Sequence, residues 1–154
     1  MKRGDRVEDF VLPDQTGTDR RFSDILAGGP VVLFFYPAAM TPGCTKEACH
    51  FRDLASEFGA VGAQRVGIST DSVDKQAQFA DKQKFDYPLL SDTDGTVATT
   101  FGVKRGLLGK FMPVKRTTFV IDTDGTVLDV IASEVSMDTH ADKALEVLRA
   151  RKTA

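Results

Sequence analysis

The 154-residue sequence contains no tryptophan, only two cysteines and only two histidines, and it has no long apolar run. Its longest apolar stretch, residues 31–40, is interrupted by Pro37 and is far shorter than the roughly 20 residues of a membrane-spanning helix. The formal net charge of −2 gives no electrostatic reason to expect binding to nucleic acid or to an anionic membrane. The first residues, MKRGDRVEDF, include the basic side chains of a signal peptide but no apolar core after them. We therefore expect a cytoplasmic protein.

The scarcity of cysteine makes the positions of the two that are present informative. Cys44 and Cys49 lie five residues apart, just after a Thr-Pro-Gly sequence. In a reducing cytoplasm permanent disulfides are rare, and paired cysteines are more often catalytic, redox-active or metal-binding. The pair therefore marks the first candidate functional site.

The length and the hydrophobic pattern predict one α/β domain over residues 1–154. A chain of this size buries roughly 70% of its unfolded surface, which is enough for one core. The apolar run 31–36 lacks alternation, as expected of a strand that is covered on both faces. Strands are also expected at residues 10–12, 21–22, 66–69, 87–90, 119–121 and 127–131, and helices at 23–28, 41–58, 72–84 and 138–151. This order predicts a mixed central sheet flanked by helices, with an N-terminal β-hairpin.

The hexapeptide DTDGTV occurs twice, at residues 92–97 and 122–127. Its acidic residues suggest a calcium loop, but the EF-hand pattern requires glycine at position six and glutamate at position twelve. Here glycine falls at position four. Since Asp and Gly readily form turns, we interpret both copies as ordinary turns.

The residues before Cys44 have the features of a helix N-terminus. With Thr41 as N-cap, Pro42 falls at N1, where its missing N–H donor has no cost, and Cys44 falls at N3. Unpaired backbone N–H groups and the helix dipole favour an anion in this first turn, which favours the reactive thiolate. The turn would follow the buried strand 31–36 at its carboxyl end, a usual location for function in α/β folds. The alternative is a buried structural cysteine beside an ordinary cap.

The five-residue spacing bears on what the two cysteines can do. Residues five apart on an α-helix differ by about 7.5 Å of rise and about 140° of rotation, which places their Cα atoms about 8.6 Å apart. A disulfide tolerates at most about 7 Å between Cα atoms. Cys44 and Cys49 therefore cannot bond unless part of the helix unwinds. This suits a reaction cycle, in which a thiolate oxidises to sulfenic acid and a second thiol condenses with it.

Two alternatives from other functional classes remain open on the residues alone. Cys44, Cys49, His50 and His140 supply enough ligands for a zinc site, although the C-x4-C-H spacing resembles no common zinc motif. A disulfide exchanger of the thioredoxin type is the other alternative, but its C-x-x-C motif is absent.

Residues 37–44, PAAMTPGC, match the P-x-x-x-T-x-x-C motif of peroxiredoxins. The longer string FYP…TPGCTKEACHFRD resembles the bacterioferritin-comigratory-protein (peroxiredoxin Q) subfamily, including a second cysteine five residues on. The similarity extends over most of the chain, from Gly4-Asp5 to Asp122. This resemblance implies a thioredoxin-like fold and reduction of hydrogen peroxide or organic hydroperoxides without metal, haem or other cofactor.

The resemblance also assigns roles to individual residues. Cys44 matches the peroxidatic cysteine, and Thr41 the threonine whose hydroxyl hydrogen-bonds the thiolate and the peroxide. Pro37 matches the proline that shields this cysteine. Arg116 matches the arginine that stabilises the thiolate and the developing charge. From the residues alone, Arg116 precedes an apolar strand and could reach inward, or it could be one surface arginine in a basic stretch.

The remaining roles concern the second half of the cycle. Cys49 matches the resolving cysteine, and Glu47 matches the subfamily's T-x-E glutamate, whose role would be to orient Arg116. The resemblance further implies thioredoxin or a similar dithiol as reductant, with no nucleic-acid or membrane partner. A monomer is expected, with a dimer as the alternative.

The sequence departs from many relatives around the site. Ala38, Ala39 and Met40 stand where relatives carry charged residues, and Lys104 replaces an aromatic residue. We hypothesise that the apolar rim, residues 38–40, favours bulky organic hydroperoxides. The apolar tract at residues 107–112 could be pocket wall, partner surface or core.

Overall fold

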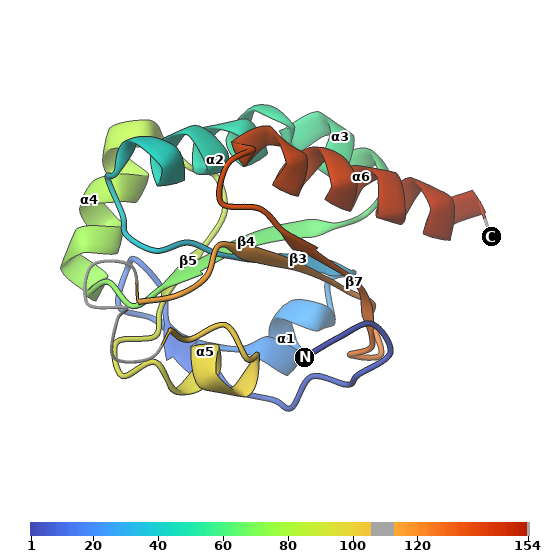
Figure 1. The fold of residues 1–154 in the computed structure, drawn as a ribbon, viewed down its shortest axis with the longest axis horizontal. Coiled ribbons are helices and arrows are strands. Elements are labelled where there is room, and N and C mark those ends of the chain that lie inside the picture. Colours follow the sequence, from blue (N-terminus) through green and yellow to red (C-terminus); the bar gives the residue numbers. More distant parts are fainter. Residues whose placement is uncertain (106–112, 154) are drawn as a thin grey trace.

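The computed structural model describes residues 1–105 and 113–153, so the apolar tract 107–112 lies outside the described residues. At the centre is a five-stranded sheet in the order β5-β4-β3-β6-β7 (Figure 1). Its strands are β3 (Val31–Phe35), β4 (Gln64–Ser69), β5 (Leu89–Ser91), β6 (Thr117–Ile121) and β7 (Val127–Ala132). Strands β3, β4 and β5 are parallel, whereas β6 is antiparallel to both β3 and β7. The predicted mixed sheet of an α/β fold is confirmed.

The N-terminal hairpin that the sequence predicts is also present. Strands β1 (Val11–Pro13) and β2 (Asp19–Arg21) pair antiparallel. The Asp14 carboxylate closes the turn, because it accepts hydrogen bonds from the backbone N–H groups of Thr16 and Thr18. Such an Asx turn is the local reason why the chain reverses here.

Helices cover both faces of the central sheet (Figure 1). On one face lie α2 (Pro42–Asp53), α3 (Ala55–Ala60), α4 (Val73–Gln83) and α6 (Met137–Thr153). On the other lie α1 (Phe22–Leu26) and α5 (Thr96–Thr100). Because successive side chains of a strand point to opposite faces, the fully buried β3 supplies both cores. Among the described residues, no helix is long and apolar enough to cross a membrane.

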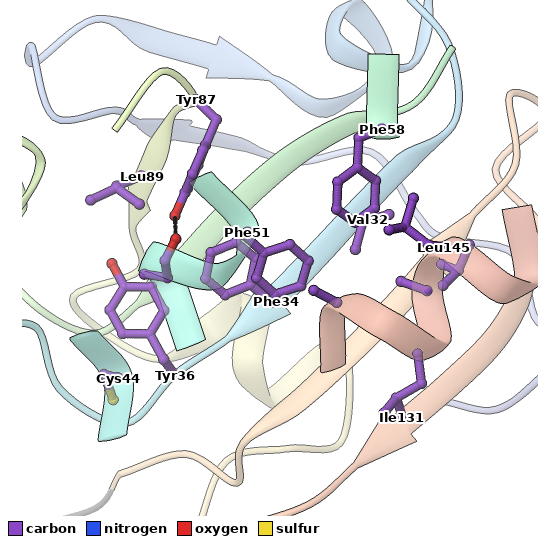
Figure 2. Close-up of a cluster of buried hydrophobic side chains, with 14 of the residues drawn as sticks. Val32, Phe34, Tyr36, Cys44, Phe51, Phe58, Tyr87, Leu89, Ile131 and Leu145 are labelled. Atoms are coloured by element: carbon purple, nitrogen blue, oxygen red, sulfur yellow. Dashed lines mark hydrogen bonds between the residues drawn. The ribbon is translucent and has the colours of Figure 1, made fainter. Parts of the chain in front are cut away.

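An aromatic cluster fixes α2 on the sheet (Figure 2). Phe51 of α2 stacks on Phe34 of β3 with ring centroids 4.2 Å apart and also contacts Phe58 of α3. The buried Tyr87 donates its hydroxyl to the Ala48 carbonyl within α2, at 2.6 Å. The helix is thus held by apolar packing on one side and by a buried hydrogen bond near its middle.

The structure corrects the predicted helix over residues 41–58, which breaks at Leu54 into α2 and α3, with Gly59 inside α3. Leu54 has non-helical dihedral angles (φ −95°, ψ 22°). The Arg65 side chain from β4 donates to the carbonyls of Phe51 and Arg52, at 3.0 and 3.5 Å. These tertiary bonds satisfy carbonyls in the last turn of α2, which a local pattern cannot reveal.

Two further helix predictions need correction. The helix predicted over residues 23–28 begins earlier and ends earlier, because Arg21 is its N-cap and α1 ends at Leu26. Ser23 lies within α1, where its N–H and hydroxyl donate to the Asp9 carboxylate. The short helix α5 was not predicted, since it is rich in threonine, a poor helix former. The Asp92 carboxylate stabilises α5 because it accepts the N–H groups of Val97 and Ala98.

Both DTDGTV segments form the turns that the sequence predicts. Asp94 accepts a hydrogen bond from the Thr96 N–H, and Asp124 accepts the equivalent bond from Thr126. The second turn connects β6 to β7. The repeated hexapeptide therefore forms a turn at both positions, each with an Asp side chain that accepts a Thr backbone N–H.

Phe51→Ala tests the role of the aromatic cluster. Removing a fully buried ring should lower the free energy of unfolding by about 3–5 kcal/mol, measured by urea denaturation. Val135→Ala is the control, because Val135 is 92% exposed, and it should change stability by less than about 0.5 kcal/mol. Similar losses for the two variants would contradict the assignment.

Candidate active site

Cys44 lies where the sequence predicts, in the first turn of α2. Thr41 is the N-cap with extended backbone angles, and Pro42 is the first helical residue. The Cys44 side chain is buried, with 1% of its surface exposed. The Thr41 hydroxyl does not cap the helix but donates to the Ala38 carbonyl at 2.8 Å. Its oxygen lone pairs thus remain able to accept a hydrogen bond from a ligand.

The loop between β3 and α2 has a strained backbone that a carboxylate just after β4 stabilises. Met40 adopts a left-handed conformation (φ 65°), which is unfavourable for a residue other than glycine. The neighbouring Ala39 N–H donates to the Asp71 carboxylate at 2.7 Å, and Ser69 donates to the same oxygen. Gln76 in turn donates to the Ser69 hydroxyl. This network connects the helix start to the next strand of the sheet.

Asp71 was not predicted from the sequence as part of the site. One signal was available, because Ser69 ends a buried parallel strand whose carboxyl end shares an edge with that of β3. Polar residues just after such a strand are candidates for the site. Nothing local shows that Asp71 bonds the backbone of residue 39.

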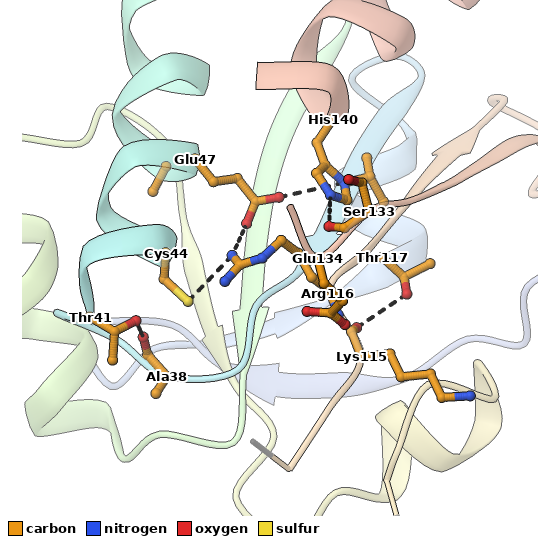
Figure 3. Close-up of polar contacts among 12 residues, drawn as sticks. Ala38, Thr41, Cys44, Glu47, Lys115, Arg116, Thr117, Ser133, Glu134 and His140 are labelled. Atoms are coloured by element: carbon orange, nitrogen blue, oxygen red, sulfur yellow. Dashed lines mark hydrogen bonds and ion pairs between the residues drawn. The ribbon is translucent and has the colours of Figure 1, made fainter. Parts of the chain in front are cut away.

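Arg116, which precedes β6, extends its side chain toward the Cys44 sulfur (Figure 3). It directly precedes β6 and is only 5% exposed, so the alternative of a surface arginine is wrong. Its Nη1 lies 3.4 Å from the Cys44 Sγ atom and 2.8 Å from the Glu47 Oε1 atom. Antiparallel pairing of β6 with β3 carries the guanidinium to the start of α2. One cation therefore contacts both the thiol and a carboxyl group.

Glu47 follows Cys44 by one helical turn and is fully buried. Its Oε1 accepts the bond from Arg116, whereas its Oε2 has no hydrogen-bond partner among the described residues. Burial raises the pKa of Glu47 to about 8, because removal of water outweighs the attraction of Arg116. The structure thus places Glu47 against Arg116, as its expected role requires.

His140 of α6 completes the buried group. Its Nδ1 lies 2.8 Å from the Thr118 hydroxyl and 3.5 Å from the Glu47 Oε2 atom, and its Nε2 lies 2.8 Å from the Ser133 carbonyl (Figure 3). Burial lowers the pKa of His140, and the positive charge of Arg116 lowers it further. From the sequence, this histidine was considered only as a metal ligand.

The four residues of the alternative zinc site are not brought together. His50 contacts Asp142 on α6 at 2.8 Å, while His140 bonds Thr118 and the Ser133 carbonyl. Within residues 1–105 and 113–153, no three His, Cys, Asp or Glu side chains form a group that could hold a metal ion.

Cys49 lies further along the same helix in a different environment. Both cysteines are free thiols, and α2 is continuous through them. The half-buried Cys49 donates its Sγ–H to Gln83 Oε1 on α4, at 3.4 Å. Burial raises the pKa of the Cys49 thiol, and Arg52 offsets this only in part. Cys44 faces an arginine, whereas Cys49 faces an amide oxygen.

The predicted apolar rim is smaller than its three residues suggest. Pro37 and Ala39 are buried, and Ala38 is half-buried. Met40 is the exposed member, with 39% of its surface accessible. Any contact of the rim with a substrate would therefore depend mainly on Met40.

Comparison with known proteins identifies relatives of this chain over most of its length. The family model described as AhpC/TSA family matches residues 3–130. The chain is 77% identical to the Mycobacterium tuberculosis protein of a crystal structure named peroxidoxin BcpB, with a TM-score of 0.94 and 97% of each chain covered. It is 39% identical to peroxiredoxin Bcp of Escherichia coli K12, over 97% of this chain and 96% of that protein. It is 34% identical to the bacterioferritin comigratory protein of Xanthomonas campestris, with a TM-score of 0.82 and coverage of 93% and 92%.

The solved structures share the architecture described above, which confirms the thioredoxin-like fold of peroxiredoxins. The family match and the identity to these relatives over nearly the whole length support the same family. The chain therefore belongs to the AhpC/TSA family and is a thiol peroxidase of its bacterioferritin-comigratory-protein (peroxiredoxin Q) subfamily.

Proposed function

We propose that the chain is an atypical two-cysteine peroxiredoxin that reduces hydrogen peroxide and organic hydroperoxides and is recycled by thioredoxin or a similar dithiol. Cys44 is the peroxidatic and Cys49 the resolving cysteine. The observation that carries the proposal is the 3.4 Å contact between Arg116 Nη1 and the Cys44 sulfur in the first turn of α2. A cation and a helix N-terminus both favour the thiolate, which is the nucleophile.

In the first step, the Cys44 thiolate forms a bond to one peroxide oxygen while the O–O bond breaks. The second oxygen leaves as hydroxide or alkoxide and takes up one proton to give water or an alcohol. Arg116 stabilises the negative charge that moves from sulfur to oxygen. Cys44 is left as an uncharged sulfenic acid.

The other site residues position the peroxide. The Thr41 oxygen, whose proton is engaged by the Ala38 carbonyl, can accept the peroxide O–H. The buried Pro37 shields the sulfur from bulk water. Glu47 orients Arg116 through the 2.8 Å hydrogen bond from Arg116 Nη1 to Glu47 Oε1. Gly43 makes room for the arginine, since a Cβ atom there would lie 3.2 Å from Arg116 Nη2.

In the second step, the Cys49 thiol condenses with the sulfenic acid, so that an S–S bond forms and water leaves. The raised pKa of Cys49 keeps it a thiol until then. Since the two residues are too far apart on an intact helix, part of α2 must unwind. Tyr87 holds α2 at the Ala48 carbonyl and Arg65 holds it at Phe51, so we expect the first turns to unwind.

Oxidation itself favours this unwinding. The Cys44 thiolate is held by Arg116, but an uncharged sulfenic acid loses most of that attraction. An external dithiol then reduces the disulfide by thiol–disulfide exchange and is itself oxidised. The relationship to peroxiredoxins supports thioredoxin as this dithiol and the cytoplasm, where thiols are kept reduced, as the location. We propose that the chain works as a monomer.

Organic hydroperoxides are proposed as substrates on two grounds. The bacterioferritin comigratory protein of Xanthomonas campestris, a relative of this chain, has alkyl peroxide reduction activity. In this chain, the exposed Met40 presents apolar surface next to Thr41 at the start of α2. An apolar substituent would bury surface against it, which a hydrogen peroxide molecule cannot do.

Gly43→Ala tests the position of Arg116. The added methyl group should displace the guanidinium by a few tenths of an ångström and lower the rate constant for Cys44 oxidation by hydrogen peroxide about tenfold. The rate is measured by competition with a haem peroxidase, and stability is measured by urea denaturation. Gly59→Ala is the control, because nothing lies within 4 Å of a Cβ atom there. An unchanged rate in Gly43→Ala would show that Arg116 is not held as described.

Cysteine variants test the two-cysteine cycle. Cys44→Ser should abolish turnover, because a serine hydroxyl is not ionised near neutral pH. Cys49→Ser should consume one equivalent of peroxide and then stop when thioredoxin is the only reductant. Thiol counting before and after peroxide addition measures both outcomes. Full thioredoxin-supported cycling of Cys49→Ser would remove the resolving role.

The substrate preference is tested by comparing kcat/KM for cumene hydroperoxide and hydrogen peroxide. We expect the wild type to favour cumene hydroperoxide. Met40→Asn should reduce that preference several-fold, because asparagine tolerates the left-handed backbone but removes the apolar side chain. An equal or lower efficiency with cumene hydroperoxide in the wild type would refute the hypothesis.

A further inference from the structure

The contact between Glu47 and His140 has a feature that an orienting role for Glu47 does not explain. Both side chains are fully buried, and His140 Nδ1 lies 3.5 Å from Glu47 Oε2. That oxygen has no hydrogen-bond partner among the described residues, although buried carboxylate oxygens are normally paired. An oxygen in this state is either strongly destabilised or carries a proton.

The hydrogen bonds of His140 indicate which of its nitrogens carries a hydrogen. Its Nε2 faces the Ser133 carbonyl, which can only accept, so Nε2 carries a hydrogen. In a neutral imidazole, Nδ1 then has one lone pair, which accepts the Thr118 hydroxyl at 2.8 Å, and Glu47 Oε2 lies 3.5 Å from the same nitrogen. A carboxylate oxygen opposite a lone pair is repelled. A proton on either atom turns this repulsion into attraction.

The charges around Glu47 and His140 also favour the binding of one proton by these two side chains. Arg116 is the cation that faces both the Cys44 sulfur and Glu47. If Cys44 is a thiolate and Glu47 a carboxylate, two buried anions share one positive charge. Glu134 adds a further negative charge nearby, although its carboxylate accepts hydrogen bonds from the Arg105 side chain and from the backbone N–H of Arg116. An unpaired buried charge is costly, and binding one proton removes it.

Tyr87, another titratable group near Glu47, does not supply that proton. Tyr87 acts on Glu47 through its charge only if ionised, and burial raises the pKa of Tyr87 well above its ordinary value. It therefore remains a neutral phenol that donates to the Ala48 carbonyl.

We propose that Glu47 and His140 hold one shared proton in the reduced enzyme, which leaves the charge of Arg116 to the Cys44 thiolate. His140 is thus a positioning residue that acts on Cys44 through Glu47 and Arg116. This inference rests on the proposed peroxidase function of Cys44 and deepens it. Because burial raises the pKa of Glu47 and lowers that of His140, the proton resides on Oε2, and the pair is electrically neutral.

The sharing has a consequence for the reaction cycle. When Cys44 becomes an uncharged sulfenic acid, Arg116 is free to pair fully with a Glu47 carboxylate, and the shared proton can leave. The peroxide step consumes one proton for each hydroxide or alkoxide released. The site therefore gives up a proton in the same step in which the leaving oxygen needs one.

The proton shared by Glu47 and His140 also sets an upper pH limit for the oxidation of Cys44. Because burial raises the pKa of Glu47 to about 8, the group is protonated at pH 7 and becomes a carboxylate above that value. The carboxylate then competes with the sulfur for Arg116. The rate constant for Cys44 oxidation should therefore decline as the pH rises through about 8.

The test measures that rate constant between pH 6 and pH 10 in the Cys49→Ser background, where only Cys44 reacts. Wild-type Glu47 should give the alkaline decline, and Glu47→Gln, which cannot ionise, should abolish it. His140→Asn should move the decline to lower pH by about one unit, the size of one lost buried hydrogen bond. In the Glu47→Gln background, His140→Asn should have no effect on the pH profile. His50→Asn is the control, since it breaks another contact between α2 and α6 but lies outside this group.

A decline that persists in Glu47→Gln, or a His140→Asn effect of equal size in both backgrounds, would overturn the proposal. A purely structural role of His140 would lower the rate at every pH. Infrared spectroscopy of the reduced protein provides a test without peroxide, because a protonated carboxyl C=O stretch at pH 7 should disappear in Glu47→Gln. If Cys44 failed to react with peroxide while this band was present, the proposed function would fail and the shared proton would stand.

Discussion

The contact on which the rest of this site depends is that between the Arg116 guanidinium and the Cys44 sulfur. A cysteine in the first turn of a helix is already favoured as a thiolate, but Cys44 is almost fully buried, and burial opposes charge. A permanently charged group at 3.4 Å offsets that cost. The position of Arg116 follows from the sheet, because pairing of β6 with β3 places the residue before β6 beside the end of β3.

The same contact connects chemistry to conformational change. The turn that bears Cys44 starts from the strained backbone of Met40, which Asp71 stabilises through the Ala39 N–H. The later part of α2 is held by Tyr87 and by apolar packing. The helix thus has a firmly held second half, and in its first half Arg116 contacts both Cys44 and Glu47. In the proposed cycle, loss of the sulfur charge on oxidation would weaken the contact of Cys44 with Arg116 and so favour unwinding of the turn that bears Cys44.

The sequence predicted those features that depend on neighbouring residues. The apolar run 31–36 specified a buried strand, and Thr41-Pro42 specified the helix start that places Cys44 at N3. The N-terminal hairpin and the two DTDGTV turns likewise follow from local Asx chemistry. The association of Arg116 with Cys44 required the family motif, because 72 residues separate them and a basic stretch offers several arginines and lysines.

The features that were missed depend on tertiary contacts. The break at Leu54 reflects bonds from Arg65, which belongs to a different element. Asp71 and His140 enter the site through the sheet edge and through the packing of α6 on β6. In the sequence, each is one polar residue among many. Their roles become visible only when the unpaired oxygen of Glu47 and the strained angle of Met40 are known.

The most direct test of this account is the rate constant for oxidation of Cys44 by hydrogen peroxide in the reduced Cys49→Ser protein, with and without Arg116→Gln. We predict that loss of the guanidinium lowers this rate constant by about a hundredfold, because the cation stabilises both the sulfur anion and the charge that develops on the leaving oxygen. A rate constant that Arg116→Gln leaves unchanged, in a protein that keeps its fold, would contradict the account.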